Sequence, residues 1–336
     1  MATIRDVAKL ASVGIGTVSR VLSKKGAVSS KTLLKVNQAM EALNFTPSSA
    51  ARSLVSKKMD TIGIWGTATS GEINRRTLRE MEAELKEFEI HLIFADGDLN
   101  SSENPNASRQ SFDRLINKGC DGIIIWGSDL PPREILQIEN EFLNITLLNN
   151  KIELIDDKCF YFDHYQAGYV CGQHLIDKGH SNIACITGWL ETDDGNQRHQ
   201  GFLSALNDNN VNIPEELIFE GDYTYRKGYE GALYLLKQDK PFTALFCGND
   251  QSAMSAIAAI TNKGLEVPND ISVMGYDDMN IASYTSPPLT TVRIPFNRMA
   301  VSATRRLLNL CYNLELNIEY DFPIQLIERL SVKNIV

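Results

Sequence analysis

The 336-residue chain lacks the features that would assign it to a membrane or secreted class. No apolar run approaches the roughly 18 residues that a membrane helix needs. The first residues do not show a charged segment followed by an apolar one, as a secretory signal does. With a hydrophobic content of 43% and a charged content of 22%, the composition is typical of a soluble globular protein. We therefore expect a cytoplasmic protein.

Patterns for metal binding and disulfides are missing as well. The six cysteines include no Cys-x-x-Cys pair, and the five histidines include no His-x-x-x-His pair. Most of the cysteines lie in apolar runs, which indicates buried reduced thiols rather than disulfides. No Ser/His/Asp or paired-acid motif stands out either. We therefore expect no metal site, no cofactor and no enzymatic activity.

Charge is distributed unevenly along the chain. Residues 1–58 hold ten Lys and Arg against Asp6 and Glu41, a net charge of +8, whereas the whole chain carries −9. The remainder therefore carries −17. A basic head on an acidic body is expected when the head binds the phosphate backbone of a nucleic acid. The charge alone would also fit an ordinary solvated face.

The first 46 residues have the periodicity of three short helices. Thr3 and Asp6 have the spacing of a capping box, and apolar residues at 4, 7, 8 and 11 form one helical face. A second helix after residue 14 would bury Val18, Val21 and Leu22, and a third after residue 29 would bury Leu33, Val36, Met40 and Leu43. Two tightly joined helices covered by a third are typical of a helix-turn-helix domain, whose second helix enters the major groove.

A competing pattern overlaps the second helix. Gly14-x-Gly16-x-x-Ser19 is similar to the fingerprint of a dinucleotide-binding enzyme. That fingerprint has to follow a strand and needs a third small residue. Because the preceding segment is helix-periodic, we reject the nucleotide interpretation.

From residue 61 the pattern changes to apolar runs that alternate with amphipathic helices. The predicted strands are residues 61–65, 91–95, 121–126, 145–148, 182–186, 217–219, 244–247 and 271–274. The predicted helices are residues 75–88, 107–118, 166–178, 197–209, 226–238 and 251–263. Near-continuous apolar strands between helices indicate parallel sheets covered on both faces. We predict an α/β body of two similar doubly wound lobes.

The head resembles the LacI/GalR family of bacterial transcription regulators. The resemblance is carried by Thr3-Ile4-x-Asp6-Val7-Ala8-x-x-Ala11 and Thr17-Val18-Ser19-Arg20-Val21-Leu22, with departures at Ser12, Gly14 and Gly16. It continues at 28–29, 45–47 and 51–54, and the body matches the family at 172–184, 198–202, 249–253, 267–278, 286–292 and 326–329. The resemblance implies an all-α helix-turn-helix head, a hinge helix and a periplasmic-binding-protein type I core of two doubly wound parallel-sheet lobes.

The implied domain boundaries follow from these matches. The helix-turn-helix DNA-binding domain would be residues 1–46, the hinge helix and linker 47–58, and the effector-binding and dimerisation domain 59–336. Lobe one would comprise about 60–160 plus 295–321, and lobe two about 161–292 plus 322–336. Three crossings near residues 160, 290 and 322 would join the lobes. Because no heptad pattern follows the last strand, we expect a homodimer rather than a tetramer.

The resemblance also implies the DNA contacts. Arg20 would contact a phosphate or a base edge, and Ile15 and Gly16 occupy the specificity positions, where they can offer only apolar contact or close approach. Leu54 would wedge into the minor groove when the hinge helix folds, although a plain flexible linker is the alternative. The predicted DNA-binding residues are Thr3, Gly14, Ile15, Gly16, Thr17, Ser19, Arg20, Ser29, Thr32, Ala51 and Leu54.

Polar residues at the carboxyl ends of the predicted strands indicate a ligand site, because ligands bind at that edge of open α/β sheets. By resemblance, Arg198 would bind a ligand hydroxyl or carboxylate, and Asp277 would accept hydrogen bonds from sugar hydroxyls. We place Asp163 in the cleft from its position after a strand, and we interpret Asp250 as a helix cap. The predicted effector-binding residues are Thr67, Asn150, Asp163, Arg198, Tyr223, Asn249, Asp277 and Phe296.

These features predict a homodimeric repressor that binds palindromic double-stranded operator DNA and responds to a small sugar. The same polar and aromatic groups would also suit a nucleobase, which the purine branch of the family binds, or another metabolite. A sugar-binding transport protein would need a signal sequence and no basic head. An enzyme on this fold would need a glycine fingerprint after the strand at 61–66, which residues 66–71 do not provide.

Overall fold

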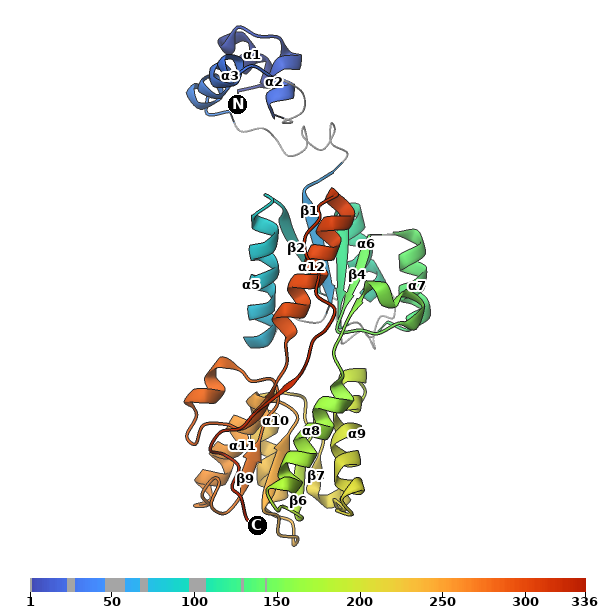
Figure 1. Ribbon diagram of the computed structural model, residues 1–336, viewed down its shortest axis with the longest axis vertical. Helices are drawn as coiled ribbons and strands as arrows, with labels where there is room; N and C mark the ends of the chain where they lie inside the picture. The colour runs from blue at the N-terminus through green and yellow to red at the C-terminus, as the bar shows by residue number, and fades with distance from the viewer. Residues whose placement is uncertain are drawn as a thin grey trace.

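A computed structural model describes residues 2–22, 28–45, 58–66, 72–96, 107–127, 130–142 and 144–336. In it a small helical head lies beyond one end of an elongated body of two lobes (Figure 1). None of the helices in these ranges is long and apolar enough to cross a membrane. All six cysteines are free and buried, as predicted.

The head consists of α1 (Ile4–Ala11), α2 (Ile15–Leu22) and α3 (Ser30–Ala42). The predicted capping box begins α1: the Thr3 hydroxyl accepts from the Asp6 amide, and the Asp6 carboxylate accepts from the Thr3 amide at 2.8 Å. The buried core of the head is Val7, Ala8, Ala11, Val18, Val36 and Ala39.

One predicted core position in the head is wrong. Leu33 is 43% exposed, and Ala39 is buried with Val36 on the inner face of α3 instead. A spacing of three residues fits a helix face only approximately at 3.6 residues per turn, so the helix turns Leu33 away from α1 and α2.

Lobe one is a parallel five-stranded sheet in the order β2-β1-β3-β4-β5. Its strands are β1 (Thr61–Gly66), β2 (His91–Asp96), β3 (Gly122–Trp126), β4 (Ile145–Leu148) and β5 (Cys159–Phe160). The helices between them are α5 (Glu72–Lys86), α6 (Ala107–Asn117), α7 (Pro132–Glu141) and a 3-10 helix at Glu153–Lys158. Every residue of β1, β3 and β4 is buried, which is why these strands read as continuous apolar runs.

Lobe two is a parallel four-stranded sheet in the order β7-β6-β8-β9. Its strands are β6 (Ile183–Ile186), β7 (Ile218–Phe219), β8 (Ala244–Cys247) and β9 (Ser272–Met274). Its helices are α8 (His164–Asp177), α9 (Asp193–Asp208), α10 (Tyr225–Leu235) and α11 (Asp250–Asn262), with 3-10 helices at Glu215–Leu217 and Asn280–Tyr284.

Helices α8 and α9 lie unusually close because glycines stand where they meet. A Cβ on Gly168 would lie 2.0 Å from the Arg198 carbonyl oxygen, and a Cβ on Gly201 would lie 1.9 Å from the Tyr165 carbonyl oxygen. Close packing at this point brings the start of α9 beside the start of α8, and both helix starts face the region between the lobes.

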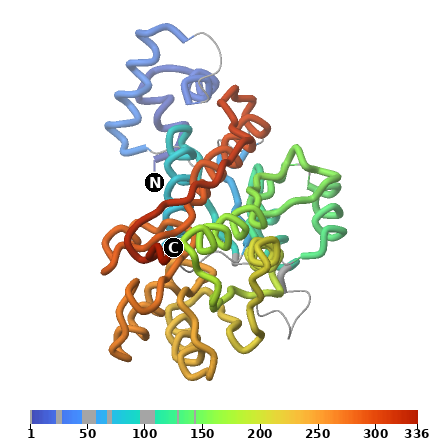
Figure 2. Tube along the Cα trace, turned by 60° about the horizontal axis from the view of Figure 1, so that its bottom comes forward, coloured from blue at the N-terminus to red at the C-terminus, as the bar shows by residue number. Residues whose placement is uncertain are grey.

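The last part of the chain passes between the lobes again. The antiparallel strands β10 (Thr291–Arg293) and β11 (Gln325–Ile327) pair beside lobe two, and between them α12 (Phe296–Tyr312) packs on lobe one. Helix α12 lies side by side with α5 in both Figure 1 and Figure 2. The sequence pattern did not single out α7 or α12 as helices.

Candidate functional site

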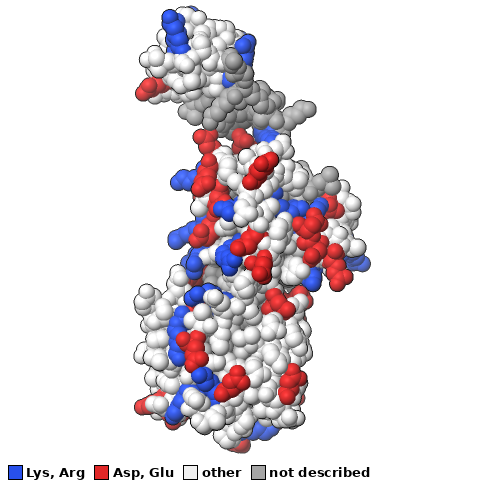
Figure 3. Space-filling view, in the orientation of Figure 1, with Lys and Arg blue, Asp and Glu red and all other residues white. Residues whose placement is uncertain are grey.

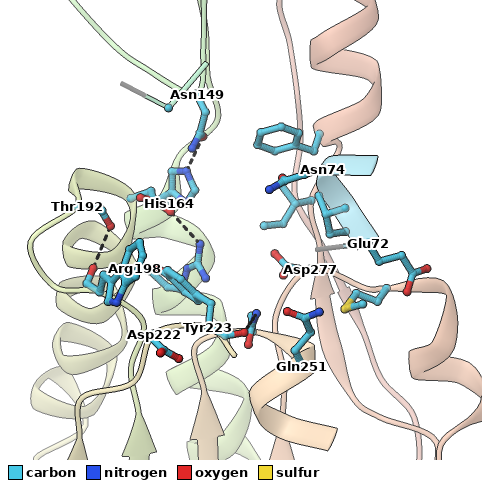
Figure 4. A pocket seen from close by; sticks show the side chains of 18 of the residues that line it. Glu72, Asn74, Asn149, His164, Thr192, Arg198, Asp222, Tyr223, Gln251 and Asp277 are labelled. Carbon is cyan, nitrogen blue, oxygen red and sulfur yellow. Dashed lines mark hydrogen bonds and ion pairs between the residues drawn. The ribbon is translucent and has the colours of Figure 1, made fainter. Parts of the chain in front are cut away.

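A cavity of about 500 Å³ opens between the two lobes. Its walls come from the carboxyl ends of strands in both sheets: Trp126 ends β3, Asn149 and Asn150 follow β4, Asn249 follows β8, and Asp277 follows β9. Figure 4 shows the side chains of Asn149 and Asp277 among those that line the cavity. The size and position are those of a small-molecule site on open α/β sheets.

Arg198 is the basic centre of the cavity. Its guanidinium carbon lies 3.7 Å from the centre of the Tyr276 ring and 5.2 Å from that of Tyr223. It donates to the Gly248 carbonyl, and its Nη2 lies 3.5 Å from an Asp194 carboxylate oxygen. Its buried Nε has no hydrogen-bond partner among the described residues. An unpartnered buried donor in a cavity is a natural contact for a ligand oxygen.

Asp277 is the acidic counterpart of Arg198. It has a left-handed backbone conformation, with φ of 113°, and its amide donates to the Val292 carbonyl at 2.9 Å. Burial raises the pKa of Asp277 to about 7, with Asp194 adding to this effect and the positive charge of Arg198 opposing it. Strained backbone conformations concentrate at functional sites, so this conformation at the cavity wall supports a functional role for Asp277.

Aromatic rings form another part of the lining. The ring centres of Trp126 and Phe296 are 5.6 Å apart, and those of Phe162 and Phe296 are 6.5 Å apart. All three side chains line the cavity. Such a wall can cover the apolar face of a sugar ring or of a planar base.

His164 joins the two lobes at the back of the cavity. Its Nε2 lies 2.8 Å from the Asn149 side-chain oxygen in lobe one, and its Nδ1 lies 3.3 Å from the Tyr276 hydroxyl in lobe two. Burial and the nearby Arg198 charge lower the pKa of His164 to about 3, so the ring is neutral. The neutral ring therefore donates from Nε2 to Asn149 and accepts from Tyr276 at Nδ1.

Acidic side chains outnumber basic ones around the cavity. Among the described residues, its lining contains one basic side chain, Arg198, against five acidic ones: Glu72, Asp193, Asp194, Asp222 and Asp277. Carboxylates accept hydrogen bonds and repel anions. The lining therefore favours a neutral ligand with many hydroxyl donors over a phosphorylated one.

The cavity brings together most of the predicted effector-binding residues. Those in its lining are Asn150, Arg198, Tyr223, Asn249, Asp277 and Phe296. Thr67 lies outside the described residues. Asp163 does not line the cavity, because its carboxylate accepts from the Gln166 amide at 2.7 Å and caps α8.

The interpretation of Asp250 as a helix cap is wrong. Asn249 is the cap of α11, with its side-chain oxygen accepting from the Ser252 amide at 2.9 Å. Asp250 is buried one residue further on and accepts from the Met279 amide and the Thr291 hydroxyl, each at 2.7 Å. It thereby supports the loop that carries Asp277.

Several residues of the cavity were not predicted. They are Glu72, Asn74, Trp126, Phe162, His164, Asp194, Asp222 and Gln251. For some of them the position in the sequence was an available signal, since Trp126 ends a predicted strand and His164 directly follows Asp163, which was placed in the cleft. The acids near Arg198 carried no such signal, because Asp193, Asp194 and Asp222 also fit ordinary surface loops.

The predicted DNA-reading face is exposed. Val18 is buried, whereas Gly14, Ile15, Gly16 and Arg20 are exposed on the other side of α2. Thr17, Ser19 and Thr32 are half-buried, and Thr3 and Ser29 are exposed caps of α1 and α3. Ala51 and Leu54 lie outside the described residues. In Figure 3 the head shows mainly basic charges, whereas both signs mix over the body.

Comparisons with known proteins agree with this architecture. Residues 3–48 match the model of the lacI family of bacterial regulatory proteins, and residues 173–332 match that of the periplasmic binding protein-like domain. The HTH-type transcriptional repressor PurR of Photorhabdus laumondii is 36% identical over 321 residues, which cover 93% of this chain and 91% of that protein. This chain belongs to the lacI family. It is a DNA-binding transcriptional repressor, and its relatives are regulators rather than enzymes.

Further relatives support the family and the fold. PurR of Yersinia enterocolitica is 35% identical over 317 residues, 92% of this chain and 90% of that one. The lac repressor dimer bound to operator and the anti-inducer ONPF superposes with a TM-score of 0.86 at 27% identity, covering 99% of both chains. The Escherichia coli transcriptional repressor ascG gives a TM-score of 0.73 at 30% identity, covering 81% of this chain and 99% of that one.

Proposed function

We propose that this repressor is a homodimer whose affinity for a palindromic operator is controlled by a neutral sugar in the interlobe cavity. The observation that carries the sugar assignment is the composition of the lining, which holds five carboxylates and one guanidinium. Each hydroxyl of a sugar can donate to a carboxylate, and the unpartnered Nε of Arg198 can donate to a sugar oxygen. The wall of Trp126, Phe162 and Phe296 would cover the ring.

On the DNA side, each head of the dimer would read one half-site. The lac repressor dimer bound to operator supports this arrangement, because that chain matches the present one over its length. Ile15 and Gly16 offer no side-chain hydrogen bond, so they would recognise thymine methyl groups and allow close approach. Arg20 would supply a phosphate or base-edge contact. The two functions would lie on separate domains, at residues 1–46 and 59–336.

A nucleobase is the second candidate for the effector. It is favoured by the relatives that carry the name PurR, since the purine branch of the family binds nucleobases. The carboxylate-rich lining argues against it, because a nucleobase has few N–H donors to offer to five acidic groups. We therefore place the sugar first.

A thermal-shift screen of the full chain tests the effector class. Neutral sugars, nucleobases, sugar phosphates and amines would be compared, because a ligand that binds the folded state raises the melting temperature by mass action. A shift with a neutral sugar alone supports the proposal. A shift confined to nucleobases, phosphates or amines contradicts the sugar assignment.

Two variants show whether the ligand binds in the cavity. Asp277→Asn should remove most of the shift, because it replaces the carboxylate that faces the ligand. Asp163→Asn is the matched control, since its side chain lies outside the cavity and asparagine caps a helix as well as aspartate does. The ligand found should then change operator affinity in a gel shift with DNA selected from random palindromes.

A further inference from the structure

The chain enters lobe one through a cluster of hydrogen bonds on Asp121. One carboxylate oxygen of Asp121 accepts from the Met59 amide at 3.0 Å. The other accepts from the Thr61 amide at 3.2 Å and from the Tyr312 hydroxyl at 2.7 Å. We call Asp121 and Tyr312 the entry anchor. Hydrogen bonds to an ionised group are about twice as strong as neutral ones, so the anchor fixes the backbone of residues 59–61 firmly.

The entry anchor is itself held in place. The Asn144 side chain donates to the Asp121 carbonyl at 2.9 Å, and the Cys311 thiol donates to the same oxygen at 3.2 Å. On the other side, the Lys58 ammonium lies 4.9 Å from the centre of the Tyr312 ring. Residues 58–61 are thus attached to the start of β3 and to the last turn of α12.

Helix α12 connects this anchor to the effector cavity. It begins at Phe296, which lines the cavity, and ends at Tyr312 in the anchor. Its 17 residues span about 24 Å at about 1.5 Å per residue. Figure 1 shows the helix running along lobe one to a position beside the start of β1. One rigid element therefore has its first residue at the cavity and its last where the body meets the linker.

Helix α12 is also bound to the rest of lobe one. Arg305 forms a two-pronged ion pair with Glu84 of α5, at 2.7 and 2.9 Å. Arg306 donates to the Ile145 carbonyl and to the Thr146 hydroxyl of β4, each at 3.0 Å. Because α12 is bound to a helix and to a strand of lobe one, a displacement of lobe one displaces the anchor as well.

We propose that Asp121 and Tyr312 are positioning residues for operator binding. They join residues 58–61 to lobe one and so set where the linker to the head begins. The further step, that an effector in the cavity changes operator affinity by displacing lobe one and this anchor, rests on the proposed function. Coupling of this kind is the difference between the operator affinities of the effector-bound and effector-free states.

The test uses the full chain with Tyr312→Phe, which removes the hydroxyl that donates to Asp121 and keeps the ring. Tyr161→Phe is a closely matched control. Tyr161 lies on the same lobe, donates to the Asp156 carboxylate at 3.1 Å, and has the Lys151 ammonium 5.0 Å from its ring centre. Operator affinity is measured on DNA selected from random palindromes with the unmodified protein.

We expect Tyr312→Phe to raise the operator Kd by between about twofold and tenfold. The upper value is reached if the whole contribution of one hydrogen bond to a charged group serves to position the linker for the operator. Tyr161→Phe should leave it unchanged. The melting temperature should fall by a similar small amount in both variants, because each loses one hydrogen bond to a carboxylate of lobe one. The Kd for the cavity ligand should stay at its original value in both. Asp121→Asn, which removes the charge at the same place, should act in the same direction as Tyr312→Phe.

Three results would overturn the proposal. An unchanged operator Kd in Tyr312→Phe would show that the anchor does not position the linker. Parallel losses of operator and ligand affinity would show a general defect of the fold. The operator Kd could rise in Tyr312→Phe while the ratio of the Kd values with and without ligand stays as in the unmodified protein. This result would refute the step in which the effector acts through the anchor. If no ligand changes the operator Kd of the unmodified protein, the proposed effector is wrong. The operator Kd of Tyr312→Phe, compared with that of the unmodified protein, still tests whether the anchor positions the linker.

Discussion

Acidification should weaken effector binding through Asp277. Burial raises the pKa of this carboxyl to about 7, Asp194 adds to the rise, and the charge of Arg198 limits it. The ionised carboxylate is the form that accepts hydrogen bonds from ligand hydroxyls. Binding therefore selects the deprotonated form and must lower the pKa in the complex. Ligand affinity is therefore greatest above the pKa of Asp277 in the ligand-free protein, and it decreases as the pH falls through that pKa.

The magnitude follows from proton competition. Below pH 7, each unit of acidification raises the ratio of protonated to ionised Asp277 about tenfold. The observed Kd therefore rises about tenfold per pH unit until the pKa of Asp277 in the complex is reached. This corresponds to about 1.4 kcal/mol of binding free energy per pH unit. His164 does not interfere, because its pKa of about 3 keeps the ring neutral over this range.

Calorimetric titration of the cavity ligand at several pH values between about 5 and 8 measures this effect. In Asp277→Asn the profile should be flat and the affinity low at every pH, because no carboxylate remains to be titrated. Asp163→Asn should keep the original profile. A Kd that stays constant in the unmodified protein, or that falls on acidification, would refute the assignment of ionised Asp277 to the ligand contact.

Three further predictions concern the head and the packing of lobe two. Gly16→Gln should change which operator is selected and leave ligand affinity intact, since a Cβ there meets nothing within 4 Å; loss of ligand binding would contradict the separation of the two functions. Gly201→Ala should lower the free energy of unfolding by about 1–3 kcal/mol, because its Cβ would lie 1.9 Å from the Tyr165 carbonyl oxygen. Urea denaturation measures this, with Ser204→Ala as the control on the same helix, and equal stabilities would disprove the steric argument. Ser29→Ala should destabilise α3 by about 1 kcal/mol through loss of its cap on the Thr32 amide, which hydrogen exchange in the head would detect; unchanged protection there would count against it.

Much of the fold could be predicted because buried helices and strands have regular patterns of apolar residues in the sequence. Strand Gly122–Trp126 is buried along its whole length, so it appears as an unbroken apolar run. The helices of lobe two were expected within four residues of their observed ends, since they alternate with such runs. The capping box at Thr3 and Asp6 is a local interaction, and local interactions depend on spacing alone.

Predictions that depended on distant packing were less successful. Leu33 fits an apolar helix face by spacing, but the neighbouring helices lie on the Val36 side. Asp163, Asn249 and Asp250 all follow strands, and spacing cannot distinguish a cap from a ligand contact or from a buried support. Helix α12 follows lobe two in the chain and packs on lobe one. Only the family resemblance assigned residues 295–321 to lobe one, because no local pattern in the sequence indicates this packing.

The centre of the cavity shows why a site needs three-dimensional information even when its motif is recognised. Arg198 was expected as a ligand contact, yet nothing in the sequence placed its guanidinium on the ring of Tyr276. The Tyr276 hydroxyl in turn donates to His164, whose other nitrogen is bonded to Asn149 of lobe one. A ligand that draws Arg198 away from that ring changes the surroundings of Tyr276, and the hydrogen bonds of Tyr276 lead to the other lobe. Contacts therefore lead from Arg198 through Tyr276 and His164 to lobe one, and we expect a ligand that binds Arg198 to alter them. His164 and Tyr276 are 112 positions apart in the chain, so no local sequence pattern could have indicated this connection.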